Sequence, residues 1–306
     1  MSLIRAVAMA CQGNARKGFI RNMSNHCVSF LPRNDKLLVT FDHMGSVHSE
    51  PPRLPWGHNL AEAMGWSHLG NMTKRNDWFR DAEMYRIYRK LRDQGFFKGF
   101  DEVVFYGASM GGFAAASFSV VSPGARVVAM SPQSTLRRDL VPWERRYLQG
   151  RRMGDWDGKW SDAARAVQGA REVKLFYDPY FQPDADHAAR FDTGNITRYP
   201  APFLGHKLPR QLQDMGVLTT VASRAIKGGL NHEMWARMLA KRKDSPAYYE
   251  ALAERAEKAG HVARARVILQ AGQGRAPHKR LAKALDRVAE AEAEAEAAAA
   301  SGSFAQ

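Results

Sequence analysis

Residues 103–116 of the chain read VVFYGASMGGFAAA. The apolar and aromatic start of this stretch predicts a buried strand, and the small residues after Gly112 favour a helix. A serine between glycines at a strand-to-helix turn can lie exposed at the carboxyl edge of a sheet, because glycine leaves room for the neighbouring strand and helix. The stretch therefore predicts either a tightly packed structural turn or a turn that presents Ser109 as a nucleophile.

The same glycine-rich turn could instead cradle a phosphate. A phosphate loop carries a lysine followed by a hydroxyl residue at the start of the helix, and G-A-S-M-G-G-F contains neither. The nucleophile interpretation is favoured for this reason.

Short apolar runs alternate with helical patterns up to about residue 200. This alternation is typical of a doubly wound α/β fold, in which a mostly parallel sheet has helices on both faces. The predicted strands lie near residues 26–30, 36–41, 68–72, 102–106, 125–130, 172–177 and 195–199. From about residue 216 the strand pattern disappears, which indicates a helical extension.

Four segments follow from this pattern: a basic N-terminal arm over 1–25, an α/β domain over 26–216, a helical extension over 217–290 and a low-complexity tail over 291–306. Within the extension, residues 246–272 resemble one tetratricopeptide hairpin broken at Gly260. Because a repeat array needs about three copies to bury its core, we favour a hairpin docked on the α/β domain over a partner-binding repeat. The tail has high helix propensity but almost no large apolar residues, so we expect it to fray.

Cysteine and hydropathy patterns limit the class of protein. Cys11 and Cys27 are the only cysteines, which argues against a disulfide framework and a zinc site. No run approaches the roughly 18 apolar residues of a membrane span, and no continuous apolar segment precedes a signal-type cleavage site. We therefore expect a cytoplasmic protein without a metal or an organic cofactor.

The formal net charge of +14 raises the question of nucleic-acid binding. The lysines and arginines are spread along the chain with carboxylates between them, as in MYRIYRKLRD, and no nucleic-acid-binding motif accompanies them. We interpret the charge as solvated helix faces that attract polyanions only nonspecifically.

A nucleophilic serine needs a histidine base, and the base needs a carboxylate that orients it. Asp178 directly follows the strand predicted at 172–177, and His206 lies behind a glycine in the loop after the strand predicted at 195–199. Ser109, Asp178 and His206 are therefore candidates for nucleophile, acid and base.

Residues 26–216 resemble the α/β-hydrolase superfamily. FYGASMGG resembles its nucleophile elbow, the D-P-x-x-x-P that begins at Asp178 its acid turn, and the G-H-K around His206 its histidine loop. In this superfamily the triad residues follow in the order Ser, Asp or Glu, His, and the chain has the same order. The resemblance implies a serine hydrolase.

The choice of carboxylate stays open. The glycine that usually separates the seventh strand from the acid is missing, so Asp184 and Asp186 are alternatives to Asp178. Asp178 is favoured because it is nearest the strand end and is followed by proline, and helix capping is the structural alternative for the other two. His187 is a rival base, although a histidine at a helix start is more often a surface residue.

Two backbone N–H groups are expected to bind an oxyanion. One belongs to Met110, the residue after the nucleophile, and the other to Asp42 or His43 in the loop after the strand at 36–41. No histidine in the chain falls into a recognised metal-binding spacing.

Residues 133–165 lie where hydrolases of this type often insert a lid, and they combine tryptophans with arginines. Such a lid is suited to an anionic or acyl-bearing substrate, although packing and solvation explain the same residues. The chain also resembles a bacterial subgroup that pairs G-x-S-M-G-G with N-x-W, here ending at Trp78, and with S-P-Q, here ending at Gln133. We predict substrate contacts for Trp78, Gln133 and, from the lid, Trp143.

These features predict a serine hydrolase that cleaves an ester or thioester through an acyl-enzyme. An acyltransferase that uses a sugar, lipid or polymer hydroxyl in place of water is the first alternative. A noncatalytic scaffold that binds a protein partner through its C-terminal helices is the second.

Overall fold

The computed structural model describes residues 16–48 and 53–302. Residues 1–15, which include Cys11 and most of the predicted basic arm, lie outside the described residues, as do residues 303–306 at the end of the predicted tail.

Eight strands form one sheet in the order β1-β2-β4-β3-β5-β6-β7-β8. The pairs β1 with β2 and β2 with β4 are antiparallel, and all later pairs are parallel. The strands are β1 (Phe19–Asn22), β2 (His26–Leu31), β3 (Lys36–Phe41), β4 (Ser67–Thr73), β5 (Glu102–Ala108), β6 (Arg126–Met130), β7 (Glu172–Tyr177) and β8 (Ile196–Pro200). The predicted doubly wound α/β fold is confirmed, and the seven predicted strands correspond to β2 through β8.

The first strand lies inside the range 1–25 that we assigned to the arm. Its four residues, FIRN, pair with β2 at the edge of the sheet. A short edge strand that ends in polar residues has no apolar run by which sequence analysis could find it.

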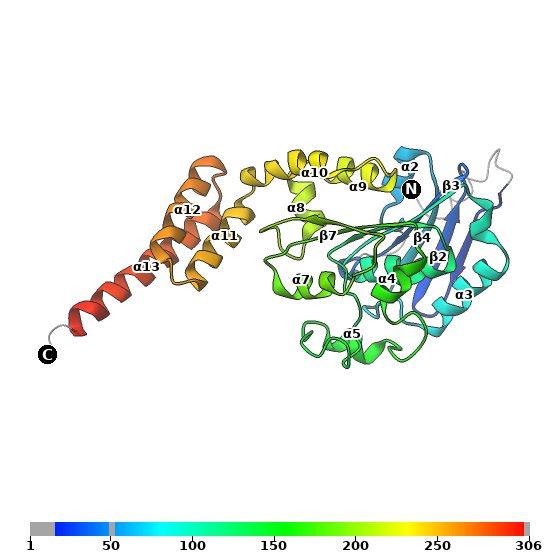
Figure 1. The fold of residues 1–306 in the computed structure, drawn as a ribbon, viewed down its shortest axis with the longest axis horizontal. Coiled ribbons are helices and arrows are strands. Elements are labelled where there is room, and N and C mark those ends of the chain that lie inside the picture. The colour runs from blue at the N-terminus through cyan, green and yellow to red at the C-terminus, as the bar shows by residue number, and fades with distance from the viewer. Residues whose placement is uncertain (1–15, 49–52, 303–306) are drawn as a thin grey trace.

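Successive side chains of each strand point to opposite faces of the sheet, and each face has its own apolar core. One face is covered by α3 (Ala82–Asp93), α4 (Met110–Phe118), α6 (Ala163–Ala166) and α7 (Gln182–Ala189). The other is covered by α2 (His58–Met64), α8 (Leu208–Asp214), α9 (Leu218–Ile226) and α10 (His232–Leu239). Figure 1 shows these two layers on either side of the sheet.

Short elements connect the layers. The segment 133–165, predicted as a lid, is mostly irregular and contains α5 (Leu148–Met153) before it enters α6. The 3-10 helices are η1 (Met44–His48), η2 (Phe96–Gly99), η3 (Ser119–Val121), η4 (Val167–Gly169) and η5 (Ala240–Asp244).

The C-terminal helices have a separate apolar cluster. They are α11 (Pro246–Lys258), α12 (Val262–Arg275) and α13 (Lys279–Gly302), and they extend from one end of the α/β body (Figure 1). The helices α11 and α12 pack against each other, and α13 packs onto both through Leu281 and Val288. Residues 291–302, expected to fray, continue α13 as helix, in line with their alanine and glutamate content. Among the described residues, no helix is both long and apolar enough to cross a bilayer.

Candidate active site

Ser109 lies at the turn between β5 and α4, with backbone angles φ 52° and ψ −119°. A positive φ is costly for a residue with a side chain, and such strain clusters at functional sites. A Cβ atom on Gly107 would lie 2.0 Å from the carbonyl oxygen of Gly111, and one on Gly111 would lie 2.6 Å from that of Phe41. Only glycine fits at these two positions, so the small residues of the motif are required by packing around the strained serine.

His206 faces this serine from the loop after β8. Its Nε2 atom lies 2.9 Å from the Ser109 hydroxyl oxygen. The preceding residue, Gly205, has a φ of 64°, a left-handed conformation that glycine adopts without strain. The predicted pair of serine and histidine is thus brought together from residues 97 positions apart.

Asp184 is the carboxylate that contacts His206. Both of its oxygens lie 2.8 Å from Nδ1 of the ring. Because Nδ1 donates to this buried carboxylate, Nε2 is left as an acceptor for the Ser109 hydroxyl. The hydrogen-bonded chain therefore runs from Ser109 through His206 to Asp184, in the first turn of α7.

Asp178, the acid favoured from the sequence, has different partners. Its carboxylate accepts the N–H of Tyr180 at 2.9 Å and the N–H of Gly205 at 2.7 Å. It thereby ties the end of β7 to the loop that carries His206. Asp186, the third alternative, accepts a hydrogen bond from Gln182. The distances favour the alternative Asp184. This residue lies in the first turn of α7 and contacts His206, whereas the Asp178 carboxylate is occupied by two backbone N–H groups.

A tyrosine from the predicted lid also reaches the histidine. The Tyr147 hydroxyl lies 3.0 Å from Nε2 of His206. Burial raises the pKa of Tyr147 to about 12, so it is a neutral phenol that competes with the Ser109 hydroxyl as a donor to this nitrogen. Its ring packs on Trp78 with 4.9 Å between centroids.

Trp78 and Gln133 lie beside the serine. The indole N–H of Trp78 donates to the Gln133 side-chain oxygen at 2.9 Å, which fixes the orientation of the amide. The amide nitrogen then points to the Ser109 hydroxyl at 3.5 Å and to that of Tyr147 at 3.4 Å, both long hydrogen bonds. Trp143 lies elsewhere: its ring packs on that of His187, 4.6 Å away, and it is 37% exposed.

Of the two candidates for the second oxyanion donor, the Asp42 N–H is already used. It donates to the carbonyl of Asn71 at 3.0 Å, and the buried Asp42 carboxylate binds Arg53 and two backbone N–H groups. The loop itself lies against the elbow, because Gly111 touches the carbonyls of Phe41 and Asp42. The N–H of His43 is left as the candidate, together with that of Met110, which begins α4 and has no intrahelical acceptor.

A strained serine elbow after β5 of a mostly parallel sheet, followed in the chain by an acid after β7 and a histidine after β8, is the arrangement of α/β-hydrolases. The chain is an α/β-hydrolase in fold. The resemblance stated from the sequence is confirmed at this level.

No family model matches the chain, and no curated protein matches it in sequence. Solved structures of similar fold include the capsule O-acetyltransferase of Neisseria meningitidis serogroup A, which is 9% identical, with 72% of this chain and 99% of that one covered and a TM-score of 0.47. An S-formylglutathione hydrolase from Agrobacterium tumefaciens is 12% identical over 69% of this chain and 93% of that one, with a TM-score of 0.43. A fluorophosphonate-binding serine hydrolase of Staphylococcus aureus is 12% identical over 70% and 97%, with a TM-score of 0.44. At these identities the likeness concerns the fold alone.

The turn that carries Asp184 is held by a charge network from the segment 133–165. Arg146 donates to Asp184 at 3.1 Å and pairs with Glu144, whose other contact is Nε2 of His187 at 3.1 Å. Burial would raise the pKa of Glu144, but the hydrogen bonds from His187 and Arg146 outweigh it and bring that pKa to about 2. Glu144 is therefore ionised, and it balances the guanidinium beside Asp184.

His187, the rival base, belongs to this network. Its Nδ1 lies 3.1 Å from the N–H of Ser134 and 2.9 Å from the hydroxyl of the same residue. Burial lowers the pKa of His187 more than Glu144 raises it, so the ring is neutral. It is a buried structural histidine and has no contact with Ser109 among the described residues.

Sequence analysis missed the contacts of Glu144, Arg146 and Tyr147 with the site. Only Arg146 was noted, as one of the arginines that accompany the tryptophans of the predicted lid. No local pattern marks them, because they reach His206 and Asp184 through an irregular segment whose path depends on the whole fold.

One group of potential metal ligands occurs among the described residues: His26, Asp77 and Asp81. Arg75 pairs with both of these carboxylates, and Asp77 also bonds His26 at 3.1 Å. Because the Arg75 guanidinium already pairs with both carboxylates, this cluster is explained as an ion-pair network that braces the turn before Trp78.

Proposed function

We propose that the protein is a serine hydrolase that cleaves an ester or thioester through an acyl-enzyme. The observation that carries the proposal is the continuous hydrogen-bonded chain from the strained Ser109 through His206 to the buried Asp184. Structural turns do not require a base and an oriented carboxylate behind the serine, whereas an activated nucleophile does.

In the proposed first step the Ser109 oxygen attacks the carbonyl carbon of the substrate, and His206 Nε2 accepts the serine proton. Asp184 keeps Nδ1 protonated, orients the ring and stabilises the imidazolium that forms. The negative charge on the substrate oxygen would be bound by the N–H of Met110 at the start of α4 and by the N–H of His43 in the loop after β3.

The intermediate then collapses. The carbon–oxygen or carbon–sulfur bond of the substrate breaks, and the leaving alcohol or thiol takes the proton from His206. Water repeats the sequence on the acyl-enzyme: His206 accepts a proton from water, the acid is released and Ser109 regains its hydrogen. A hydroxyl acceptor in place of water would give acyl transfer with the same groups.

Labelling with a fluorophosphonate probe tests the proposal. We expect a covalent adduct on Ser109, located by mass spectrometry, and loss of that adduct in Ser109→Ala and His206→Ala. Ser223→Ala is the matched control, because this serine lies on α9 and its hydroxyl donates only to the Thr220 carbonyl one turn earlier. Circular dichroism and thermal unfolding establish that each variant is folded.

A folded wild-type protein that takes up no label at Ser109 would contradict the proposal and favour the scaffold alternative. If the wild-type protein is labelled at Ser109, fresh unlabelled protein is then given acetyl and longer acyl esters and thioesters, with and without sugar hydroxyls. Free acid as product indicates hydrolysis, and an acylated sugar indicates transfer. Ser109→Ala should lower kcat/KM by about 10⁴-fold or more in either case.

A further inference from the structure

A pocket of about 430 Å³ lies between the loop that carries His206 and the C-terminal helix α11. From the α/β body it is lined by Tyr180, Phe181, Phe203 and Gly205, and from α11 by residues that include Arg255. Its volume is in the range of small-molecule sites. The helical extension therefore completes a cavity that the α/β body forms only in part.

This pocket adjoins the candidate base. Gly205 is the residue before His206, and the Phe181 ring lies 6.2 Å from the His206 ring. In the proposed reaction His206 delivers a proton to the leaving alcohol or thiol, so that part of the substrate has to lie on the histidine side of the serine. The position of the pocket matches the leaving group better than the acyl group.

An aromatic wall forms one side of the pocket. The rings of Tyr180 and Phe203 are stacked, with 4.4 Å between centroids, and Tyr180 is 50% exposed. Phe203 has a φ of 65°, a strained value for a residue with a side chain. The Arg255 guanidinium carbon lies 4.3 Å from the centre of the Tyr180 ring. This cation–π contact holds the guanidinium of Arg255 at the pocket.

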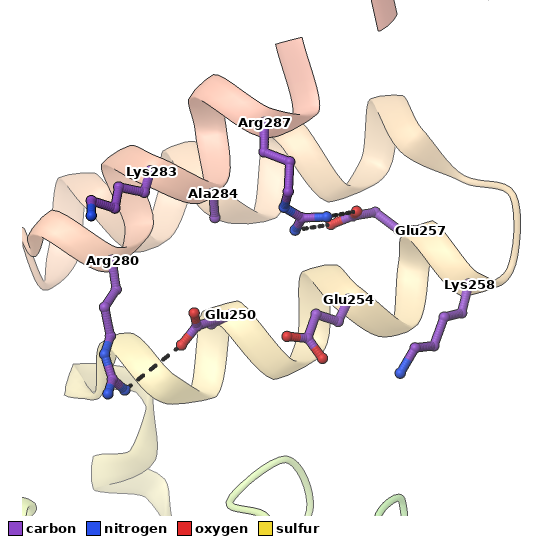
Figure 2. Close-up of a pocket in the computed structure, with 8 residues that line it drawn as sticks. All are labelled: Glu250, Glu254, Glu257, Lys258, Arg280, Lys283, Ala284 and Arg287. Carbon is purple, nitrogen blue, oxygen red and sulfur yellow. Dashed lines mark hydrogen bonds and ion pairs between the residues drawn. The ribbon is translucent and has the colours of Figure 1, made fainter. Parts of the chain in front are cut away.

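Arg255 and Lys258 of this pocket differ from Arg280 and Arg287 of the extension, which pair with carboxylates. On the neighbouring groove between α11 and α13, Glu257 pairs with Arg287 and Glu250 with Arg280 (Figure 2). Among the side chains that the structure describes, neither Arg255 nor Lys258 lies within ion-pair distance of a carboxylate.

Two carboxylates, those of Asp178 and Glu254, also line the pocket, and they differ in their hydrogen-bond partners. Asp178 is buried and already accepts two backbone N–H groups. Glu254 is exposed and directly precedes Arg255 on α11. Glu254 therefore opposes an anionic ligand, while Arg255 and Lys258 favour one.

We propose that this pocket binds the alcohol or thiol part of the substrate and that this part carries a carboxylate or a phosphate. The proposal rests on the proposed function, since it assigns the leaving group of that reaction to the histidine side of the site. Arg255 and Lys258 pair with the anion, and the exposed edges of Tyr180 and Phe203 contact the apolar part beside it. When the ester bond breaks, the leaving alcohol takes its proton from His206. The carboxylate or phosphate that it carries stays ionised, so the product is still an anion.

Four acetyl or acyl esters test this assignment. 4-Acetoxybenzoate and 4-acetoxyphenyl phosphate carry the anion on the leaving group, 4-acetoxybenzamide is the neutral counterpart of the first, and monophenyl succinate carries the anion on the acyl group. The variants are Arg255→Gln, Lys258→Gln and Glu254→Gln, with Arg264→Gln on α12 as an exposed cationic control outside the pocket. Steady-state kinetics and thermal unfolding are measured for each.

We expect Arg255→Gln and Lys258→Gln each to raise KM about fivefold for the two esters with anionic leaving groups, as an exposed ion pair allows. The KM for 4-acetoxybenzamide and for monophenyl succinate should stay unchanged, and Arg264→Gln should change none of them. Glu254→Gln should lower KM for the anionic leaving groups. The larger effect, on the benzoate or on the phosphate, identifies the acidic group.

Equal effects on neutral and anionic esters, or a lowered unfolding temperature with unchanged kinetics, would show that these side chains only brace α11 on the body and would overturn the inference. A charge effect confined to monophenyl succinate would overturn it as well, because the anion would then belong to the acyl part. If a folded wild-type protein hydrolyses none of the esters, 4-acetoxybenzamide included, the inference is overturned, and the proposed function fails with it where Ser109 also takes up no fluorophosphonate label. Hydrolysis of the neutral ester without charge selectivity rejects the inference alone.

Discussion

The turn around Ser109 and the turn around Asp184 hold two ends of one hydrogen-bonded chain, but they are built in different ways. The serine turn is held by close backbone packing, in which Gly107 and Gly111 touch carbonyl groups and leave no space for a side chain. The carboxylate turn is held by charged side chains, among them Arg146 and Glu144 from a segment that precedes β7. One turn is therefore determined by steric contacts over a few residues, and the other by electrostatic contacts between distant segments.

This difference indicates how each turn responds to change. Steric packing tolerates no added atom and is insensitive to pH, because residues 107–112 contain no acidic or basic side chain. A charge network tolerates a substitution that keeps the shape of a side chain. Its contribution to stability, however, depends on the protonation state of each charged residue in it. The predictions below use this contrast, beginning with the largest effect.

Replacing each of the two aspartates after β7 by asparagine should separate a loss of activity from a loss of stability. Asp184→Asn removes the acceptor that keeps His206 in the productive tautomer, and we expect kcat/KM to fall by about 10⁴-fold. Asp178→Asn places an amide where two backbone N–H groups now donate, so we expect a loss of about 1–3 kcal/mol in the free energy of unfolding and less than a tenfold change in kcat/KM. Ester kinetics and urea unfolding measure both. A 10⁴-fold loss in Asp178→Asn with little loss in Asp184→Asn would make Asp178 the acid.

The sequence predicted the parts of the site that are encoded locally. The glycines around Ser109 and the strand before them form one contiguous pattern, and His206 follows a predicted strand directly. The choice between Asp178 and Asp184 could not be made in this way, because both follow β7 within a few residues. It depends on the direction of the first turn of α7, which is set by tertiary packing.

The contacts of the lid segment were beyond sequence reasoning for the same reason. Tyr147 and Arg146 are neighbours in the chain, yet one contacts His206 and the other Asp184. Arg146 was noted as one of the lid arginines, but an irregular segment has no periodicity from which to read its path.

Substitution at the serine turn should show the steric limit. In Gly107→Ala the new Cβ would lie 2.0 Å from the Gly111 carbonyl oxygen, so we expect the free energy of unfolding to fall by at least about 3 kcal/mol. Gly194→Ala is the control, because a Cβ there meets no atom within 4 Å, and it should change stability by less than about 1 kcal/mol. Urea unfolding at constant pH measures both. Equal stability of the two variants would mean that the elbow relaxes freely, and the contrast with the carboxylate turn would be lost.

Lowering the pH should weaken the carboxylate turn in two windows. Burial places the pKa of His187 below its ordinary 6.5, so the unfolded chain binds a proton first and stability falls as the pH drops below about 6.5. Glu144, with a pKa of about 2 against an ordinary 4.5, contributes stability that is complete above pH 4.5 and is lost between 4.5 and 2. For Glu144 the full effect corresponds to about 3 kcal/mol.

Urea unfolding from pH 7 to pH 3 checks this dependence. His187→Gln should flatten the upper window and Glu144→Gln the lower one, while the destabilisation caused by Gly107→Ala should be the same at every pH. Unchanged pH profiles in both network variants would show that the carboxylate turn, like the elbow, is held by packing alone.

The smallest effect is expected at Tyr147, where the lid segment meets the base. In the resting site Nε2 of His206 has one lone pair, and the hydroxyls of Ser109 and Tyr147 both lie within hydrogen-bond distance of it. Tyr147→Phe keeps the ring packed on Trp78 and removes the competing donor, so the base is more available to the serine. We expect the rate of fluorophosphonate labelling at Ser109 to rise about two- to fivefold, the range that one net hydrogen bond allows. A slower rate would show instead that the phenol stabilises the charge that develops during attack, and the lid segment would then contribute to the reaction itself as well as to the position of the acid.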